Sequence, residues 1–273
     1  MSELVEVAPG LRRIALETPT LAPATSTNAY VLGTKNAVLV EPASPHPHEQ
    51  ARLLDQLARQ GVSVAAIFLT HHHVDHIGGV PVLQAHAGLP VWAHAETAKR
   101  LPFAVDRLMD EGDELEVEGV HWRALHTPGH APGHLCLLSS AGSLVAGDMV
   151  AGTGTILIDP VDGDMAQYLD SLRRLASLAP SRLFPSHGPS LDDGADSLHR
   201  YVAHRLAREA RIVAALRQIA WASLEALAEV AYADAPHAPR VLVHASLLAH
   251  LQKLSAEGHV LGLGDTWSLV SQD

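Results

Sequence analysis

The feature that most constrains this chain is a run of histidines and an aspartate at residues 71–76, which reads His-His-His-Val-Asp-His. It follows the apolar residues 64–69, which fit a strand buried on both faces. Because side chains alternate along an extended chain, the first and third histidines are predicted to point the same way, with the aspartate and the last histidine in the turn beyond. Imidazole and carboxylate groups are good ligands for zinc and similar divalent ions. The pattern favours a metal site at a strand end over a histidine-rich loop that binds metal non-specifically.

Three later segments place further histidines and an aspartate in similar surroundings. Residues 127–134 read Thr-Pro-Gly-His-Ala-Pro-Gly-His, residues 145–148 read Val-Ala-Gly-Asp, and residues 184–189 read Phe-Pro-Ser-His-Gly-Pro. Each lies next to a short apolar run and contains glycine or proline, which indicates strand ends and tight turns. Loops at strand ends are where a rigid scaffold usually presents its ligands. These segments are therefore predicted to complete the metal site.

Taken in order, the motifs resemble those of the metallo-β-lactamase superfamily: His-x-His-x-Asp-His, a Thr-Pro-Gly-His segment that ends in His134, Gly-Asp, and Ser-His-Gly. The resemblance implies an α/β fold, the αβ/βα sandwich of the family. It also implies two divalent metal ions, with zinc expected and manganese or iron as alternatives. The implied ligands are His71, His73 and His134 for the first metal, Asp75, His76 and His187 for the second, and Asp148 shared by both. Asp75 and Asp148 are the expected catalytic residues.

Two other histidines lie within or beside these motifs and are expected to stay off the metals. His72 occupies a position that does not bind metal in the family. His130 is interpreted as a histidine of the turn, or as one that supports a ligand, because His134 fits the family position better.

Apolar periodicity predicts alternating strands and helices, which by itself indicates only the α/β class. Strands are predicted at residues 11–16, 28–32, 37–40, 64–69, 91–94, 114–117, 121–126, 134–138 and 143–146. Helices are predicted at residues 45–60, 79–86, 165–178 and 197–221. The irregular segment 149–164 directly follows Asp148, so it either borders the substrate cleft or is a plain connector.

The pattern changes after Ala220. A helix capped by Ser223 at 224–232, a second helix at 240–256 and a hairpin within 258–270 together resemble a small winged-helix domain. The whole chain then resembles the β-lactamase-like 2 subgroup, some members of which are single-strand ribonucleases. We therefore expect a catalytic domain at 1–220 and a winged-helix-like domain at 221–273. The second domain has two cations against six carboxylates, so a structural role is favoured over DNA binding.

Composition limits the partners and the location. The net charge of −11 disfavours a general nucleic-acid binder. No apolar run reaches the roughly 18–20 residues that span a bilayer, and the acidic N-terminus lacks the charge pattern of a signal peptide, so no membrane partner is expected. The single cysteine, Cys136, favours a reducing cytoplasm. A small-molecule substrate is expected, RNA is an alternative, and the oligomeric state is open.

The expected reaction is hydrolysis. Two divalent ions a few ångströms apart lower the pKa of a shared water from near 16 toward about 7, and the bridging hydroxide needs no serine or cysteine nucleophile. Three functions stay open: a hydrolase for a small ester, thioester or lactone, a single-strand endoribonuclease, and a non-catalytic regulator with a winged-helix tail. The acidic surface favours the first, and the complete ligand set disfavours the third. The second needs a strand path lined by basic residues of the long helix, namely Arg200, Arg205, Arg208 and Arg211.

Overall fold

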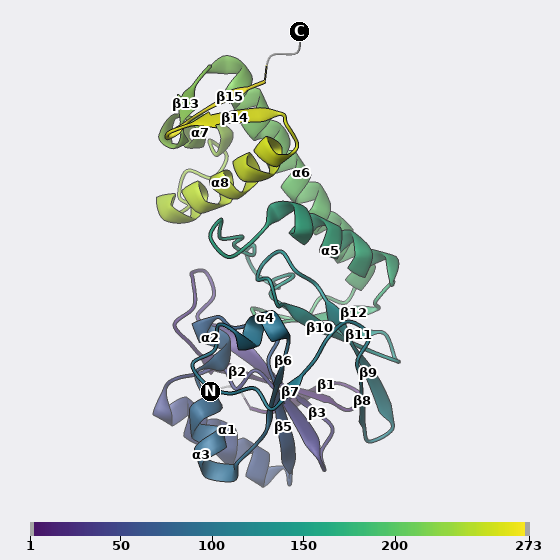
Figure 1. The fold of residues 1–273 in the computed structure, drawn as a ribbon. Helices are drawn as coiled ribbons and strands as arrows, with labels where there is room; N and C mark the ends of the chain where they lie inside the picture. Colours follow the sequence, from purple (N-terminus) through teal and green to yellow (C-terminus); the bar gives the residue numbers. More distant parts are fainter. Residues whose placement is uncertain (1–2, 271–273) are drawn as a thin grey trace.

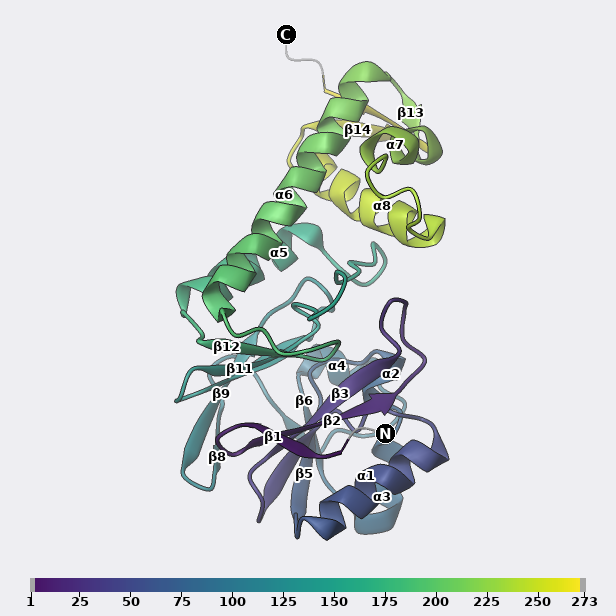
Figure 2. The same cartoon turned by 180° about the vertical axis from the view of Figure 1, so that it is seen from behind.

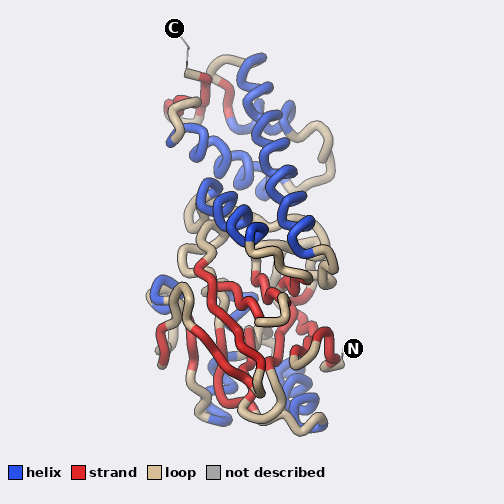
Figure 3. Tube along the Cα trace, turned by 90° about the vertical axis from the view of Figure 1, so that its right-hand side faces the viewer, coloured by secondary structure: helices blue, strands red, loops and turns tan. Residues whose placement is uncertain are grey.

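The computed structural model describes residues 3–270 of the chain. Two β-sheets face each other with helices on their outer surfaces, and a smaller C-terminal unit stands at the end of a long helix (Figures 1 and 2). Strands dominate the sandwich and helices dominate the C-terminal part (Figure 3). The predicted α/β class is confirmed. Within residues 3–270, no helix is both long and apolar enough to cross a membrane.

The first sheet has seven strands in sequence order. The strands up to β4 pair antiparallel, and those from β4 onward pair parallel. Their bounds are β1 (Val5–Ala8), β2 (Leu11–Glu17), β3 (Ser26–Leu32), β4 (Ala37–Val40), β5 (Val64–Phe68), β6 (Val91–Ala93) and β7 (Arg107–Leu108).

Two helices cover the outer face of this sheet, α1 (Pro47–Arg59) and α3 (Val80–Ala87). In α1 the buried Leu53 and Leu57 are four residues apart, so they share one face of the helix and pack against Ile67 of β5. The short helices α2 (Val74–Ile77) and α4 (Ala95–Ala98) lie at the edge where β5 and β6 end.

The second sheet has five strands in the order β12-β11-β10-β9-β8. Large side chains from both sheets fill the space between them, including Tyr30, Phe68, Trp122 and Phe184. The outer face packs against helices α5 (Met165–Ser177) and α6 (Gly194–Gln218). The strand bounds are β8 (Glu114–Val117), β9 (Val120–His126), β10 (Leu135–Ser139), β11 (Ser143–Gly147) and β12 (Arg182–Pro185).

The predicted elements differ from the observed ones mainly at their ends. The long helix begins at Gly194, three residues before its predicted start, and ends at Gln218. Strand β10 begins at Leu135, because the backbone N–H of His134 still belongs to the preceding turn and donates to the carbonyl of Ala131.

The C-terminal unit has its own hydrophobic core. The end of α6 contributes Ile212, Ala215 and Leu216, which pack with Leu227 and Leu247 of the two following helices. Ser223 caps the first of these helices, as predicted, by accepting the backbone N–H of Ala226. The remaining elements are β13 (Ala222–Ser223), α7 (Leu224–Ala231), α8 (Arg240–Ala256), β14 (Val260–Leu263) and β15 (Thr266–Leu269), and the sheet order is β13-β15-β14.

Candidate metal centre

The predicted ligands meet at one edge of the sandwich, where strands of both sheets end. In the first sheet, β5 leads into the run at 71–76. In the second, β11 leads directly to Asp148, and β12 leads to His187. Backbone contacts join the two sheets here, since Leu135 donates to the carbonyl of Thr70 at 2.9 Å. Because strands β11 and β12 are parallel, their carboxyl ends meet at the same edge and bring residues distant in sequence together.

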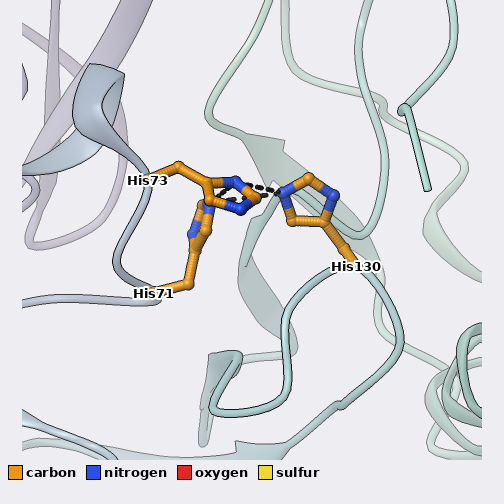
Figure 4. Close-up of side chains that lie close together, drawn as sticks. All are labelled: His71, His73 and His130. Atoms are coloured by element: carbon orange, nitrogen blue, oxygen red, sulfur yellow. Dashed lines mark hydrogen bonds between the residues drawn. The ribbon is translucent and has the colours of Figure 1, made fainter. Parts of the chain in front are cut away.

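Three imidazoles form what we call the first cluster, His71, His73 and His130 (Figure 4). The Nε2 atom of His130 lies 3.2 Å from Nε2 of His71 and 3.0 Å from Nδ1 of His73. The same two atoms of His71 and His73 are 3.0 Å apart. Three ring nitrogens therefore converge on one point, which is the arrangement that a metal ion with imidazole ligands requires.

A second cluster lies beside it and contains Asp75, His76 and His187. The Oδ1 atom of Asp75 lies 3.7 Å from Nε2 of His76, and its Oδ2 atom lies 3.5 Å from Nε2 of His187. Its donor set of two imidazoles and a carboxylate suits a divalent transition metal.

Asp148 lies between the two clusters. Its Oδ2 atom is 3.5 Å from Nε2 of His130 in the first cluster. The same oxygen is 3.5 Å from Nε2 of His76 and 3.4 Å from Nε2 of His187 in the second. One carboxylate therefore reaches both groups of ligands.

Several buried atoms at this place have no hydrogen-bond partner, among them Oδ1 of Asp148 and Nε2 of His76. Buried polar atoms almost always have a partner in a folded protein, so an unpartnered carboxylate oxygen beside an unpartnered imidazole nitrogen indicates a missing cation. The residues present thus fit divalent metal ions, in agreement with the metal-binding prediction.

Burial and charge set the protonation states of the site. Burial lowers the pKa of His71 well below its usual value and that of His130 to about 3, so both rings are neutral, the form that binds metal. Burial raises the pKa of Asp148, but the imidazoles of His76 and His187 lower it more, to well below its usual range. Burial lowers the pKa of His76, whereas Glu41, Asp148 and Asp75 raise it well above normal. A metal at the second cluster must therefore displace a proton from His76.

Contacts outside the clusters fix how the rings face. His130 donates from Nδ1 to the carbonyl of Leu157 at 2.9 Å, and His187 from Nδ1 to the carbonyl of Ser26 at 3.0 Å. The Nε2 atom of His73 lies 3.1 Å from a carboxylate oxygen of Asp162. In each ring the opposite nitrogen is left to face its cluster, which is how metal-binding histidines are usually oriented.

Sequence reasoning missed Glu41, which links several parts of the site. This fully buried carboxylate accepts a hydrogen bond from Ser186 at 2.7 Å and another from Thr70. Its Oε1 atom also lies 3.0 Å from Nδ1 of His76. The sequence did hold a signal, because Glu41 follows the buried strand β4 at the same sheet edge as the histidine run.

The structure does not bring His134 into the first cluster, which corrects the sequence-based assignment. Its Nδ1 lies 2.8 Å from the hydroxyl of Thr127, and its Nε2 accepts the backbone N–H of Asp148 at 3.0 Å. Both ring nitrogens are therefore used within the protein. His134 instead supports the backbone of Asp148, and His130 occupies the position that was expected for it. A side chain at Gly147 would collide with the His134 ring, so this contact needs glycine there.

His72 lies outside both clusters, although with His73 and Asp162 it forms a further group of possible ligands. Its Nε2 lies 3.1 Å from Asp162, while its Nδ1 is buried without a partner. Burial, followed by the charge of His73, lowers the pKa of His72 to about 4.

A cleft of about 1680 Å³ opens from the metal site. One wall is the segment 149–164, which contributes Ile156, Leu157 and Asp162, so this segment borders the cleft and is not a plain connector. The C-terminal unit also lines the cleft, through Tyr232 and Leu242.

Fold and site together define a metal-dependent hydrolase, and the comparison with known families agrees. The model of the metallo-beta-lactamase superfamily matches residues 22–187, so the chain belongs to that superfamily. It is similar to the beta-lactamase-like protein 2 homolog of Caenorhabditis elegans, with 29% identity over 86% of this chain and 80% of the relative.

Solved structures show the same fold. A metallo-beta-lactamase family protein from Thermus thermophilus aligns with a TM-score of 0.82 and 25% identity over 97% of this chain and 100% of that one. The protein TTHA1623, solved in a di-iron-bound form, aligns with a TM-score of 0.54 and 30% identity over 67% of this chain and 97% of its own.

Proposed function

We propose that this hydrolase uses two divalent metal ions to cleave a small ester, thioester or lactone. The observation that supports it most is the position of Asp148, whose Oδ2 lies within 3.5 Å of imidazoles from both clusters. Zinc suits this donor set best, and manganese or iron are alternatives, iron having support from the di-iron form of TTHA1623. The proposed ligands are His71, His73 and His130 for the first metal, Asp75, His76 and His187 for the second, and Asp148 for both.

When bound, two such ions supply a water of lowered pKa and an electrophile for the scissile carbonyl. The protein then has to orient this water and manage its protons. Asp148 lies between the two clusters, so its carboxylate would hold both ions and thereby set where this water binds. Asp75 lies at the cleft wall and is placed to pass a proton to the leaving group. These are the two residues for which a catalytic role was expected.

The cleft supports a substrate with an apolar acyl group. Three large apolar side chains from separate segments, Leu21, Val74 and Val161, line it while remaining exposed to solvent. Apolar groups that line a cleft beside a reactive centre favour ligands that cover them, at about 25 cal/mol per Å² of apolar surface removed from water.

The arginines that a ribonuclease would use are engaged within the protein. Arg200 pairs with Asp193, and Arg208 and Arg211 both pair with Asp234. Arg205 lines the cleft but is almost fully buried, and its Nη2 donates to the carbonyl of Ile156. Guanidinium groups already paired with carboxylates have little charge left for phosphates. We therefore rank single-strand RNA cleavage second.

For residues 221–273 we propose a winged-helix-like domain that closes the cleft. Its support is the order of two helices and a hairpin, with Tyr232, Leu242 and Val243 on the cleft wall. The domain has only Arg240 and Lys253 as cations, and both pair with carboxylates of the protein. A structural role is thus better supported than a regulator that binds nucleic acid.

The fully loaded protein is expected to hold two metals per chain, because the ligands form two clusters that share Asp148. Elemental analysis after gentle purification and after reconstitution would measure this. Saturation at one metal, with the second cluster of Asp75, His76 and His187 left uncoordinated, would contradict the proposal.

The substrate class is tested by comparing carbon and phosphorus esters. We expect metal-dependent cleavage of an aryl ester or a generic thioester, and little or no cleavage of single-stranded RNA. Reversal of Arg200, Arg205 and Arg208 to glutamate provides the RNA control. The ranking is wrong if the protein cleaves RNA robustly, loses that activity steeply with salt, and loses it on charge reversal.

A further inference from the structure

We infer that helix α6 positions the metal ligand His130, acting through Arg205 and the carbonyl groups of residues 156 and 157. The inference rests on the ligand role proposed above for His130. Arg205 lines the cleft but is almost fully buried, and we class it as a positioning residue because it acts on His130 through the backbone of residues 156 and 157.

Arg205 is a buried cation without an acidic partner. Its side chain lies in α6 with only 3% of its surface exposed, and it forms no ion pair with any residue between 3 and 270. Its Nη2 donates a hydrogen bond to the carbonyl of Ile156, and its guanidinium lies over the ring of Tyr168 at 5.3 Å. Burying a guanidinium costs free energy unless its contacts compensate. The hydrogen bond to Ile156 therefore offsets part of the free-energy cost of burying this cation.

The next carbonyl along the chain holds His130. Leu157 accepts the Nδ1–H of that ring at 2.9 Å, which leaves Nε2 to face His71 and His73. The carbonyl of Ile156 and the Cα atom of Leu157 share one planar peptide unit, and only the two backbone dihedral angles of Leu157 separate that unit from the second carbonyl. Arg205 and His130 thus hold neighbouring points of one short segment.

The side chains of Ile156 and Ile158 pack in the hydrophobic core, but the backbone of this segment has few contacts of its own. Within the described chain, no backbone–backbone hydrogen bond involves residues 153–158. The segment is anchored beyond its ends, where Tyr201 bonds to both backbone groups of Ala151 at 2.8 and 2.7 Å and Asp162 contacts His73. Two of these anchors, Tyr201 and Arg205, lie one helical turn apart on α6. The helix that leads into the C-terminal unit therefore also orients a metal ligand.

The two clusters depend on this contact to different degrees. His130 belongs to the first cluster, whereas His76 and His187 of the second are held by Glu41 and by the carbonyl of Ser26. Loss of Arg205 should weaken the first metal and spare the second. A role in folding alone would not separate the two.

The test uses the full-length Arg205→Met variant, which keeps an apolar side chain of similar length and removes the donor. Binding of Zn²⁺ to the metal-free protein is measured by competition with a chromogenic chelator. The His130→Ala variant identifies the binding step of the first cluster, and His187→Ala identifies that of the second. We expect the first-cluster step to weaken about 10–100-fold, as is usual when the hydrogen-bond support of a ligand is lost. The second step should stay unchanged.

A second readout needs no metal. In the metal-free protein the Nδ1–H of His130 should give a protected imidazole signal by NMR, identified by its absence in His130→Ala. Arg205→Met should lose or exchange-broaden it, and Arg205→Lys, which keeps a donor and the charge, should recover part of it. Arg200→Met is the matched control, since Arg200 lies on the same helix and pairs with Asp193.

Several outcomes would overturn the inference. One is a folded Arg205→Met protein with both Zn²⁺ steps and the His130 signal intact. Another is equal weakening of both steps in proportion to a loss of stability. If Arg205→Met does not fold, Arg205→Leu, which also lacks the donor, decides by the same criteria. Retention of both steps by His130→Ala would instead refute the proposed ligand set, and with it this inference.

Discussion

Asp148→Ala is expected to abolish hydrolysis while leaving the fold largely intact. The carboxylate lies within 3.5 Å of imidazoles of both clusters, so its removal takes a ligand from each metal. Losing only the outer support of a ligand costs about 10–100-fold, so loss of the shared ligand should exceed about 1000-fold in kcat/KM. The steady-state rate on an aryl ester, measured with elemental analysis of the same sample, gives the result.

The fold should survive because the Asp148 side chain is not part of the hydrophobic core. Circular dichroism and the melting temperature of the metal-free protein would verify this. His72→Ala is the matched control, since His72 lies next to the first cluster but outside it, and its metal content should stay near that of the parent. An Asp148→Ala protein with two metals and most of its activity would show that Asp148 is not the shared ligand. Loss of metal by His72→Ala as complete as by His73→Ala would show that the ligand set is wrong.

Much of the fold could be predicted from the sequence, because its main strands are apolar runs with clear ends. The strand Ala37–Val40, the strand Glu114–Val117 and the helix Arg240–Ala256 have the bounds that periodicity predicts. The pairing of the strands could not be predicted this way, and the sandwich was expected only because the motifs resemble a known family.

The candidate site shows where local patterns stop being informative. His130 and His134 occupy nearly identical contexts, because each directly follows a Pro-Gly pair. Their tertiary contacts differ. The ring of His130 donates to the carbonyl of Leu157, whereas the ring of His134 accepts the backbone N–H of Asp148. Neither contact can be read from residues 127–134 alone.

The arginines of the long helix illustrate the same limit. Their sequence is compatible with a phosphate path, although a solvated face or a domain contact is the more common role of such a helix. The structure shows carboxylates beside Arg200, Arg208 and Arg211, while Arg205 is buried against the carbonyl of Ile156. The partner Asp234 lies 26 residues from Arg208, beyond the range of helix-spacing rules.

His130→Ala should lower the metal content and His134→Ala should leave it unchanged. Together the two variants test the corrected ligand assignment. His130→Ala removes one of the three nitrogens of the first cluster, so the protein should bind one metal instead of two and lose at least about 100-fold in kcat/KM. His134→Ala should keep both metals. It should instead lower the free energy of unfolding by about 2–3 kcal/mol, because it leaves the buried N–H of Asp148 without an acceptor and opens a cavity.

Zinc stoichiometry and urea unfolding of the metal-free proteins separate these effects. His134→Gln is the informative control, because its amide oxygen can accept the Asp148 N–H and should recover part of the lost stability. If His134→Ala binds a single metal while His130→Ala still binds two, the family-based assignment of His134 is right and the hydrogen bonds of its ring must rearrange on metal binding. If both variants lose one metal, alanine at position 134 does not distinguish a ligand from a residue that positions Asp148. The glutamine variant then decides: recovery of the lost metal by His134→Gln would show that the ring of His134 is needed only as an acceptor for the N–H of Asp148.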